Sequence, residues 1–395
     1  MAKQFNIPRG YRSDIIGSIK TKRASADPRK TDLSPTELVR GGVTFLVARF
    51  FGFCYGVENA IEIAYRALEE NPTKRVFLLS EMIHNPHVNN DLISRGVIFL
   101  QTADGKELFP LSDLNSDDVV IIPAFGTTPE IVEDLRLRGI NPATYNATCP
   151  FVEKVWKRGR QIGEQGFSVV IHGKHSHEET RATFSQVRPA APSVVIRDYD
   201  EAQLLTQYIA GELPPERFYE DFKGRFSEGF DAIQDLRRVG VINQTTMLAE
   251  ETREIALLIK ESLRKRFGND DLPKHYADTR DTLCYATSEN QRAMKALLEC
   301  DADIAVIVGG YNSSNTSHLV ELCHGRLPAF YVKDAEEIIS RKSIRHLDLE
   351  KGIVETANWL PTKGSVRVLV SAGASCPDAM VEAVIERIAD VYPVS

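Results

Sequence analysis

The chain has 395 residues, of which 43% are hydrophobic and 26% charged, as is usual for a folded globular protein. This length exceeds what one hydrophobic core usually serves, so we expect two or three domains. The formal net charge of −7 argues against a general nucleic-acid-binding surface, and no apolar run reaches the roughly 18 residues that a membrane-spanning helix requires. The first residues resemble neither a secretory signal nor a transit peptide. We therefore expect a cytoplasmic protein, or one of the plastid stroma if a presequence has been removed.

Along the chain, predicted strands alternate with predicted helices. Residues 1–40 come first, and with nine Lys or Arg against four Asp or Glu and little periodicity they predict an irregular arm. The apolar runs that follow predict strands at 43–50, 75–79, 96–100, 118–123, 168–173, 239–243, 304–309, 329–332 and 366–371. Apolar residues at helical spacing between these runs, as at Val57, Ala60, Ile61 and Ala64, predict helices. The alternation indicates α/β units with mainly parallel sheets.

Three cysteines divide this pattern into comparable blocks. Cys54, Cys149 and Cys284 each stand where an apolar run gives way to a helix-like stretch. The blocks predict an N-terminal arm followed by three α/β lobes. Their bounds are 1–40 for the arm and 41–148, 149–283 and 284–395 for the lobes. Residues 212–236, which are rich in Pro, Gly and acidic side chains, predict a surface insertion in the second lobe.

Three thiols presented alike suggest convergence on one centre. Three thiolates fall one short of a closed tetrahedral or cubane site, and an atom with an open coordination position can do chemistry. A helix that begins just after each cysteine aims its positive end at the sulfur, which predicts a lowered thiol pKa. A single buried cysteine, by contrast, is more often an inert small hydrophobe. We expect that of Cys300 and Cys323, and leave Cys376 open. No disulfides are expected in a cytosolic chain of this length.

Polar turns follow several predicted strands, at the end where ligands bind in parallel α/β sheets. Ser313, Ser314 and Asn315 open an apparent helix. Hydroxyls, amides and helix N–H groups there can bind an anion, although spacing alone favours plain capping. His84 and His177 can bind phosphate or a metal, but a lone histidine in a loop usually does neither.

Three further polar residues lie in such turns. Glu179, beside a histidine, can be tuned for proton transfer, or it can be a solvated residue of a first helical turn. Thr245 belongs to a Thr-Thr pair, which is common in turns and gives the weakest signal. Ser375 ends the polar turn at 371–375.

Eight motifs in a fixed order resemble one known family. They are GFCYGVENAI (52–61), IHNPHV (83–88), NATCPFVEKV (146–155), HSHEET (175–180), NQTTM (243–247), LCYATSENQ (283–291), GGYNSSNTSHL (309–319) and SAGASCPD (371–378). In this order they are similar to 4-hydroxy-3-methylbut-2-enyl diphosphate reductase of the LytB family. The basic arm and residues 212–236 resemble the longer form found in cyanobacteria and plastids.

The resemblance implies three α/β lobes around a central cavity that holds an iron–sulfur cluster. Cys54, Cys149 and Cys284 would hold a [4Fe-4S] cluster and leave one iron without a protein ligand. Six residues would bind the substrate diphosphate, namely His84, His177, Ser313, Ser314, Asn315 and Ser375. Glu179 would deliver protons, and Thr245 would help to place the substrate hydroxyl and that carboxyl.

The implied reaction is the reductive dehydroxylation of (E)-4-hydroxy-3-methylbut-2-enyl diphosphate to isopentenyl and dimethylallyl diphosphate. This is the last step of the non-mevalonate (MEP) isoprenoid pathway. The substrate hydroxyl would bind the open iron. Reduced ferredoxin is the implied electron donor, and part of the basic arm is expected to face such an acidic partner.

One residue departs from the family pattern. Many bacterial members have histidine where this chain has Phe125, so a diphosphate contact carried by that ring is lost. Thr127 and Thr128 next to it are candidates to compensate. Two other readings of the chain remain open at this point. One is a non-catalytic zinc protein with three thiolates and a histidine such as His84, and the other is a diphosphate-binding module whose cysteines belong to the core.

Overall fold

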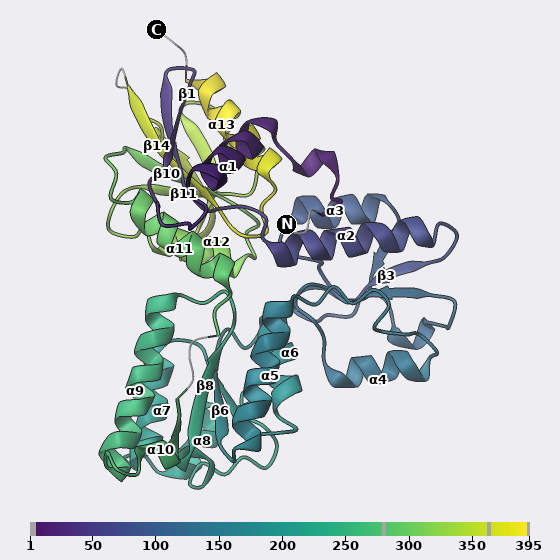
Figure 1. The fold of residues 1–395 in the computed structure, drawn as a ribbon, viewed down its shortest axis with the longest axis vertical. Coiled ribbons are helices and arrows are strands. Elements are labelled where there is room, and N and C mark those ends of the chain that lie inside the picture. Colours follow the sequence, from purple (N-terminus) through teal and green to yellow (C-terminus); the bar gives the residue numbers. More distant parts are fainter. Residues whose placement is uncertain (1–4, 279–281, 362–364, 393–395) are drawn as a thin grey trace. The chain divides into compact units, whose positions relative to one another are not determined.

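The computed structural model describes residues 5–278, 282–361 and 365–392. The chain forms two compact units. Unit 1 contains Met1–Glu62, Ile83–Asp91 and Tyr285–Ser395, and unit 2 contains Ile63–Met82 and Leu92–Cys284. Figure 1 traces the elements in chain order. No helix of the described ranges combines the length and apolar character that crossing a bilayer demands.

Unit 1 is built on a seven-stranded sheet with the order β1-β2-β14-β10-β11-β12-β13. The strands are β1 (Thr36–Arg40), β2 (Val43–Val47), β14 (Val366–Ala372), β10 (Ile304–Val308), β11 (Ala329–Val332), β12 (Ser343–Asp348) and β13 (Gly352–Ala357). The four from β2 to β11 are parallel, and those at both edges are antiparallel. The helices of this unit are α1 (Asp14–Ala26), α11 (Tyr285–Leu297), α12 (Ser314–Glu321) and α13 (Asp378–Val391).

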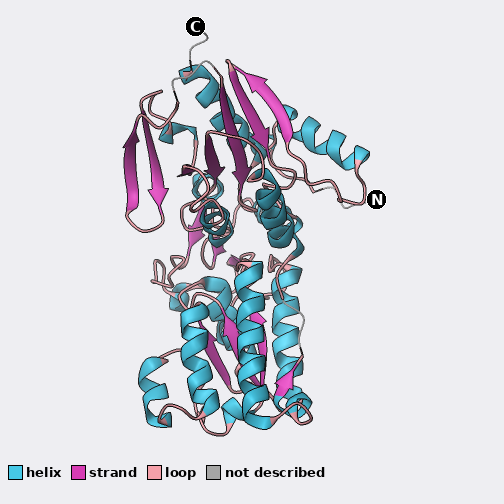
Figure 2. Cartoon of the chain, turned by 90° about the vertical axis from the view of Figure 1, so that its left-hand side faces the viewer, coloured by secondary structure: helices cyan, strands magenta, loops and turns pink. Residues whose placement is uncertain are grey.

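Unit 2 contains two smaller sheets whose strands are all parallel. One has the order β4 (Val97–Phe99), β3 (Val76–Leu78), β5 (Val119–Ile121), and the other β7 (Ser193–Ile196), β6 (Ser168–His172), β8 (Val239–Asn243), β9 (Tyr276–Ala277). Helices flank the strands of the four-stranded sheet (Figure 2). The helices of the unit are α4 (Pro129–Leu137), α5 (Pro150–Glu164), α6 (Glu178–Val187), α7 (Tyr199–Ala210), α8 (Pro215–Asp221), α9 (Ala249–Phe267) and α10 (Leu272–His275). The helices α2 (Tyr55–Glu70) and α3 (Pro86–Ser94) include residues of both units.

The α/β class with mainly parallel sheets is confirmed, and all nine predicted strands form. The first predicted lobe, however, does not begin with a strand of its own. Val43 to Val47 of β2 pair in parallel with Val366 to Val370 of β14. The expected boundary at residue 41 therefore does not separate β2 from the C-terminal sheet. The sequence contains no local signal for a pairing over more than 300 residues.

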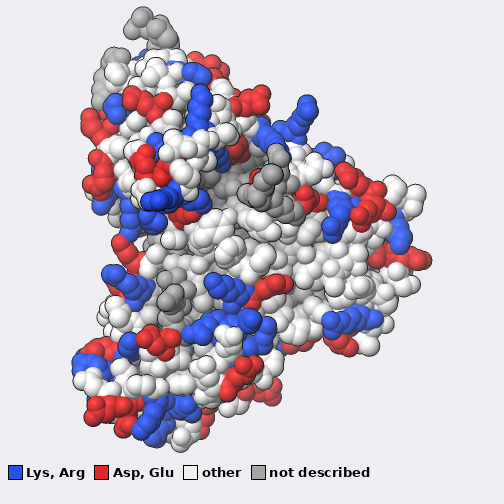
Figure 3. Space-filling view, viewed as in Figure 1, with Lys and Arg blue, Asp and Glu red and all other residues white. Residues whose placement is uncertain are grey.

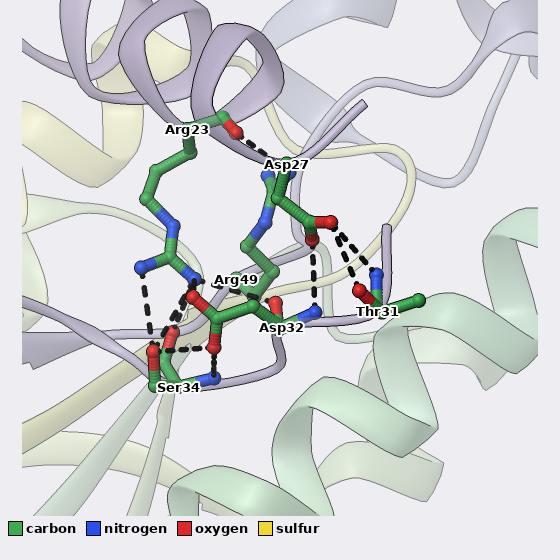
Figure 4. A network of polar contacts seen from close by, with 6 residues as sticks. All are labelled: Arg23, Asp27, Thr31, Asp32, Ser34 and Arg49. Atoms are coloured by element: carbon green, nitrogen blue, oxygen red, sulfur yellow. Dashed lines mark hydrogen bonds and ion pairs between the residues drawn. The ribbon is translucent and has the colours of Figure 1, made fainter. Parts of the chain in front are cut away.

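The prediction of an irregular N-terminal arm is wrong. The arm holds α1 and β1, and α1 packs against α13. Ile16 is fully buried in the core of unit 1, and Lys20 pairs with Asp378 at 2.6 Å. The polar network of Figure 4 stabilises the segment after α1. In it, a guanidinium nitrogen of Arg23 lies 3.1 Å from a carboxylate oxygen of Asp32. Helical periodicity is weak here because few apolar side chains of α1 are buried.

The prediction of a surface insertion at 212–236 is also wrong. This segment contains α8, and its aromatic residues Phe218, Phe222 and Phe230 are buried in the core beside the four-stranded sheet. The ring centroids of Phe218 and Phe230 stack at 5.2 Å. Pro, Gly and acidic residues determine the turns of the segment, whereas its phenylalanines fill the core.

Candidate functional site

One group of predicted site residues lies in unit 1 at the carboxyl ends of neighbouring strands. We call it the hydroxyl cluster; it comprises Cys54, His84, Ser313, Ser314, Asn315 and Ser375. The strands β2, β14 and β10 are adjacent and parallel, so the turns that follow them meet at one sheet edge. The turn after β2 carries Cys54, whose backbone N–H donates to the carbonyl of Ala374 at 3.3 Å. Sheet topology thus brings the turns of Cys54 and Ser375 together.

The first turn of α12 is fixed by hydrogen bonds of its own side chains. Ser313 is the N-cap, and its hydroxyl accepts the Thr316 N–H at 3.3 Å. Asn315 accepts the Ala374 N–H at 2.8 Å through Oδ1, and its Nδ2 donates to Thr287 at 3.4 Å. Capping therefore occurs, as spacing alone suggested. It also fixes a buried turn of hydroxyl and amide groups at the positive end of a helix, where an anion is stabilised.

His84 is joined to this turn through backbone contacts. The Ser375 hydroxyl donates to the His84 carbonyl at 3.1 Å. A Cβ atom on Gly310 would lie 2.5 Å from that same carbonyl oxygen, so only glycine allows this approach. Both His84 and Ser375 are buried. The six members of the hydroxyl cluster therefore belong to one packed edge of unit 1.

The residues that follow two of the cysteines touch each other in unit 1. The N–H of Tyr55, next to Cys54, donates to the hydroxyl of Tyr285, next to Cys284, at 3.2 Å. The ring of Phe5 packs edge-on against Tyr55 with centroids 4.9 Å apart. The first residues of α2 and α11 consequently lie side by side, and the N-terminal arm contacts both through Phe5 and Lys30.

The second group of predicted site residues lies in unit 2, and we call it the thiol cluster. It comprises Cys149, His177, Glu179, Thr245 and Cys284. The turn after β6 carries His177 and Glu179, and the turn after its parallel neighbour β8 carries Thr245. The N–H of Cys284 donates to the Thr245 carbonyl at 3.3 Å. Strand order again explains why these residues meet.

Glu179 and Thr245 form a buried pair. Only 1% of Glu179 is exposed, and its carboxyl oxygens accept the Thr245 N–H at 2.6 Å and approach the Thr245 hydroxyl at 2.9 Å. The Glu179 N–H donates to Nδ1 of His177 at 3.2 Å, which makes His177 the N-cap of α6. Because Nδ1 accepts, neutral His177 carries its proton on Nε2 and can donate it to a ligand.

The thiol of Cys149 behaves differently from the prediction. It is the N-cap residue of α5, and the N–H groups of Phe151 and Val152 favour its thiolate. The pKa of this thiol is nevertheless raised to about 11, chiefly by burial and also by the nearby Cys284 and Glu179. The prediction of a lowered pKa is therefore wrong for Cys149, because the desolvation of the thiolate outweighs its stabilisation by the start of the helix. Such a thiol loses its proton at neutral pH only to a cation that binds the sulfur.

Phe125 occupies the place of the lost histidine and contacts a site residue. Its ring meets the ring of His177 edge-on, with centroids 5.6 Å apart and planes at 84°. Thr128 is already engaged as the N-cap of α4, and the carbonyl of Thr127 accepts from Gln186 at 3.0 Å. Phe125 thus adds an aromatic wall against which His177 is oriented.

Sequence reasoning missed several residues that position the site. On α11, Thr287 and Asn290 are buried polar residues that contact the amide of Asn315. In unit 2, Gln244 accepts from Thr180 at 2.9 Å and joins the turns after β6 and β8. The available signal in α11 was a set of polar residues at positions that helical spacing predicts to be buried.

The cysteines fit a metal cofactor better than a disulfide framework. All six are free, which confirms that expectation. Neither unit, over the residues that the structure describes, contains a group of three or more His, Cys, Asp or Glu able to bind a metal ion. The half-buried Cys149 stands at a helix start, where the N–H groups of Phe151 and Val152 favour the thiolate that a metal binds.

Parallel α/β sheets whose carboxyl edges carry cysteines, a buried carboxyl–hydroxyl pair and a polar helix start are typical of an α/β enzyme. The family model described as LytB protein matches residues 45–389. The chain belongs to the LytB family.

Its relatives carry one common name. A 4-hydroxy-3-methylbut-2-enyl diphosphate reductase of Picosynechococcus sp. is 38% identical over 380 residues, which cover 96% of this chain and 92% of that protein. One of Synechococcus sp. (strain RCC307) is 40% identical over 97% of this chain and 89% of its own. These relatives confirm the resemblance to the cyanobacterial form. The solved structure of a reductase of the same name, the terminal enzyme of the non-mevalonate pathway, matches with a TM-score of 0.51 and 27% identity over 88% of this chain and 99% of its own.

Proposed function

We propose that the chain reduces (E)-4-hydroxy-3-methylbut-2-enyl diphosphate to isopentenyl and dimethylallyl diphosphate, as the last enzyme of the non-mevalonate pathway. Family membership and nearly full-length relatives of that name support the oxidoreductase activity. The observation that carries the chemistry is the contact chain from Glu179 through Thr245 to Cys284. It joins the buried carboxyl of Glu179 to the backbone of Cys284, whose thiol would bind the metal.

Cys54, Cys149 and Cys284 would hold the [4Fe-4S] cluster. When bound, such a cluster supplies single electrons and a Lewis-acidic iron that lacks a protein ligand. The position of each cysteine at the start of a helix supports this assignment, since Cys54 directly precedes α2, Cys149 is the N-cap of α5 and Cys284 directly precedes α11. The contact between Tyr55 and Tyr285 and the electrostatic effect of Cys284 on Cys149 support a common centre for the three.

The hydroxyl cluster would bind the substrate diphosphate, together with His177. Ser313, Ser314, Asn315 and Ser375 offer neutral donors, and the start of α12 contributes its positive end. These groups bind an anion without metal assistance. A fixed diphosphate leaves the allylic hydroxyl at the far end of the substrate, so binding energy is used for positioning.

Glu179 would supply the proton that lets the hydroxyl leave as water. The reaction consumes two electrons and two protons, one proton for the departing oxygen and one for carbon. The 2.9 Å contact between Glu179 and the Thr245 hydroxyl allows the threonine to relay a proton or to orient the substrate hydroxyl. Burial of this pair excludes water that would compete for the proton.

Reduced ferredoxin would deliver the electrons, and a cytoplasmic location accompanies this assignment. The whole proposal is tested on protein purified without oxygen. We expect a brown protein with about four iron and four sulfide per chain, which converts the substrate to both products with dithionite and methyl viologen. A colourless zinc protein, or a brown one without conversion, would contradict the proposal.

A further inference from the structure

A groove in unit 2 runs along α5 next to the two cysteines of that unit. We call it the α5 groove, and it has a volume of about 620 Å³. Three basic residues and one acidic residue line it together with polar and apolar ones, namely Lys154, Lys157, Arg158, Asp278, Phe151, Gln161, Thr282 and Leu283. Val155 belongs to its apolar floor. The combination of an apolar floor and basic walls is typical of a protein-binding surface rather than of a small-molecule pocket.

The groove begins at the proposed cluster ligands. Cys149 is the N-cap of α5, and Lys154 stands five residues further on, about 7.5 Å along the helix axis. Leu283 is covalently joined to Cys284. A partner bound in the groove therefore contacts residues that lie within two positions of two proposed ligands in the chain.

The basic side chains of the groove lack acidic partners. Lys154 and Lys157 are exposed and form no ion pair with any residue in the described ranges. Arg158 donates to the backbone carbonyl of Asp278 at 3.4 Å and forms no ion pair within the part of the chain that the structure describes. Lys and Arg gather over the α5 and α6 region in Figure 3. On a chain whose net charge is −7, this local excess of positive charge favours an acidic partner.

We propose that the α5 groove is the docking site of an acidic one-electron carrier protein. The inference rests on the proposed function, which consumes two electrons delivered singly. In each encounter the carrier is oxidised by one electron and the enzyme is reduced by one, so two encounters complete a turnover. Electron-transfer partners form small, short-lived interfaces, and opposite charges chiefly raise their rate of association. A small basic groove beside the acceptor satisfies both requirements.

The test compares two charge reversals in the holoenzyme with two electron donors. K154E/K157E reverses the groove, and K223E/K265E makes the same change in charge at exposed lysines elsewhere in unit 2. A reduced plant-type [2Fe–2S] ferredoxin is the acidic carrier, and methyl viologen with dithionite is the small donor. At low salt we expect K154E/K157E to lower the second-order rate with ferredoxin about tenfold or more, and the loss to shrink as salt screens the charges. Both variants should keep wild-type activity with methyl viologen.

Two results would overturn the inference. One is an equal loss with both donors in K154E/K157E, because that indicates damage to the enzyme. The other is a ferredoxin rate that K154E/K157E leaves unchanged or lowers no more than K223E/K265E does, which would place docking elsewhere. Wild-type protein that binds its cluster but fails with methyl viologen would instead refute the proposed function, and the two failures are therefore distinguishable.

Discussion

The hydroxyl cluster of unit 1 and the thiol cluster of unit 2 are built alike but consist of different chemistry. Each lies at the carboxyl edge of parallel strands, in turns that lead into helices. The first relies chiefly on neutral hydroxyl and amide donors that also cap α12. The second contains groups that exchange protons, namely two thiols, a carboxyl and an imidazole. Under the proposed function, anion binding falls chiefly to unit 1 and proton transfer to unit 2, while Cys54 of unit 1 would share in metal binding and His177 of unit 2 in anion binding.

The largest effect should come from the thiols. Cys149→Ser should lose iron and activity together, because a buried serine hydroxyl does not replace a thiolate ligand. Iron and sulfide analysis and the visible spectrum measure this loss. Cys300→Ser, a cysteine outside both clusters, is the matched control and should keep its iron. A fully active Cys149→Ser enzyme would end the assignment of the thiol cluster.

Proton transfer should be the next most sensitive step. Glu179→Gln should keep the cluster and bind substrate, yet lower kcat by about 10²–10⁴-fold, as expected when a general acid is removed. Steady-state kinetics alongside iron analysis separates the two properties. Thr245→Ser preserves the hydroxyl and the backbone donor and should remain close to wild type. Near-normal turnover in Glu179→Gln would exclude this residue as the proton source.

Changes in the hydroxyl cluster should affect binding rather than chemistry. Ser314→Ala removes a donor to a charged diphosphate, which is worth about 1.5–3 kcal/mol, so KM should rise about tenfold or more. The control is Ser317→Ala, because that hydroxyl donates within α12 to the Ser313 carbonyl at 3.2 Å. An unchanged KM with an altered cluster spectrum would reverse the division between the two clusters.

The smallest effect should appear where an aromatic ring orients an imidazole. Phe125→Ala removes the edge contact with His177, worth about 0.5–1.5 kcal/mol, so KM should rise a few-fold. Phe125→Tyr keeps the ring and should restore wild-type binding. If Phe125→Ala and Phe125→Tyr have the same KM, the ring does not orient His177.

The sequence predicted the positions of strands better than it predicted which strands pair with each other. Continuous apolar runs located nine strands, because burial on both faces leaves a strong local pattern. The strands β12 and β13 at one end of the seven-stranded sheet were not predicted, since two residues of β12 and none of β13 are buried. The helix α1 was not predicted for a similar reason. Ile16 packs in a core formed by residues far away in the sequence, and the apolar residues of α1 do not recur at helical spacing.

The candidate site followed from motifs, and its geometry followed from pairing that no motif encodes. The residues of both clusters were named from their positions after apolar runs and from the family resemblance. Which turns meet depends on the strand orders β2-β14-β10 and β6-β8, which are long-range contacts. The raised pKa of Cys149 was not predictable either, because burial overrides the local effect of the helix start.

The pairing of β2 with β14 has a consequence for biosynthesis. A ribosome adds about 5–20 residues per second, so Val43 to Val47 wait on the order of 15–60 s before their partners from Val366 onward emerge. Until then the hydroxyl cluster is incomplete, and the backbone N–H of Cys54 lacks its acceptor, the carbonyl of Ala374. Under the proposed function, a cluster that uses Cys54 as a ligand can therefore be completed only after translation.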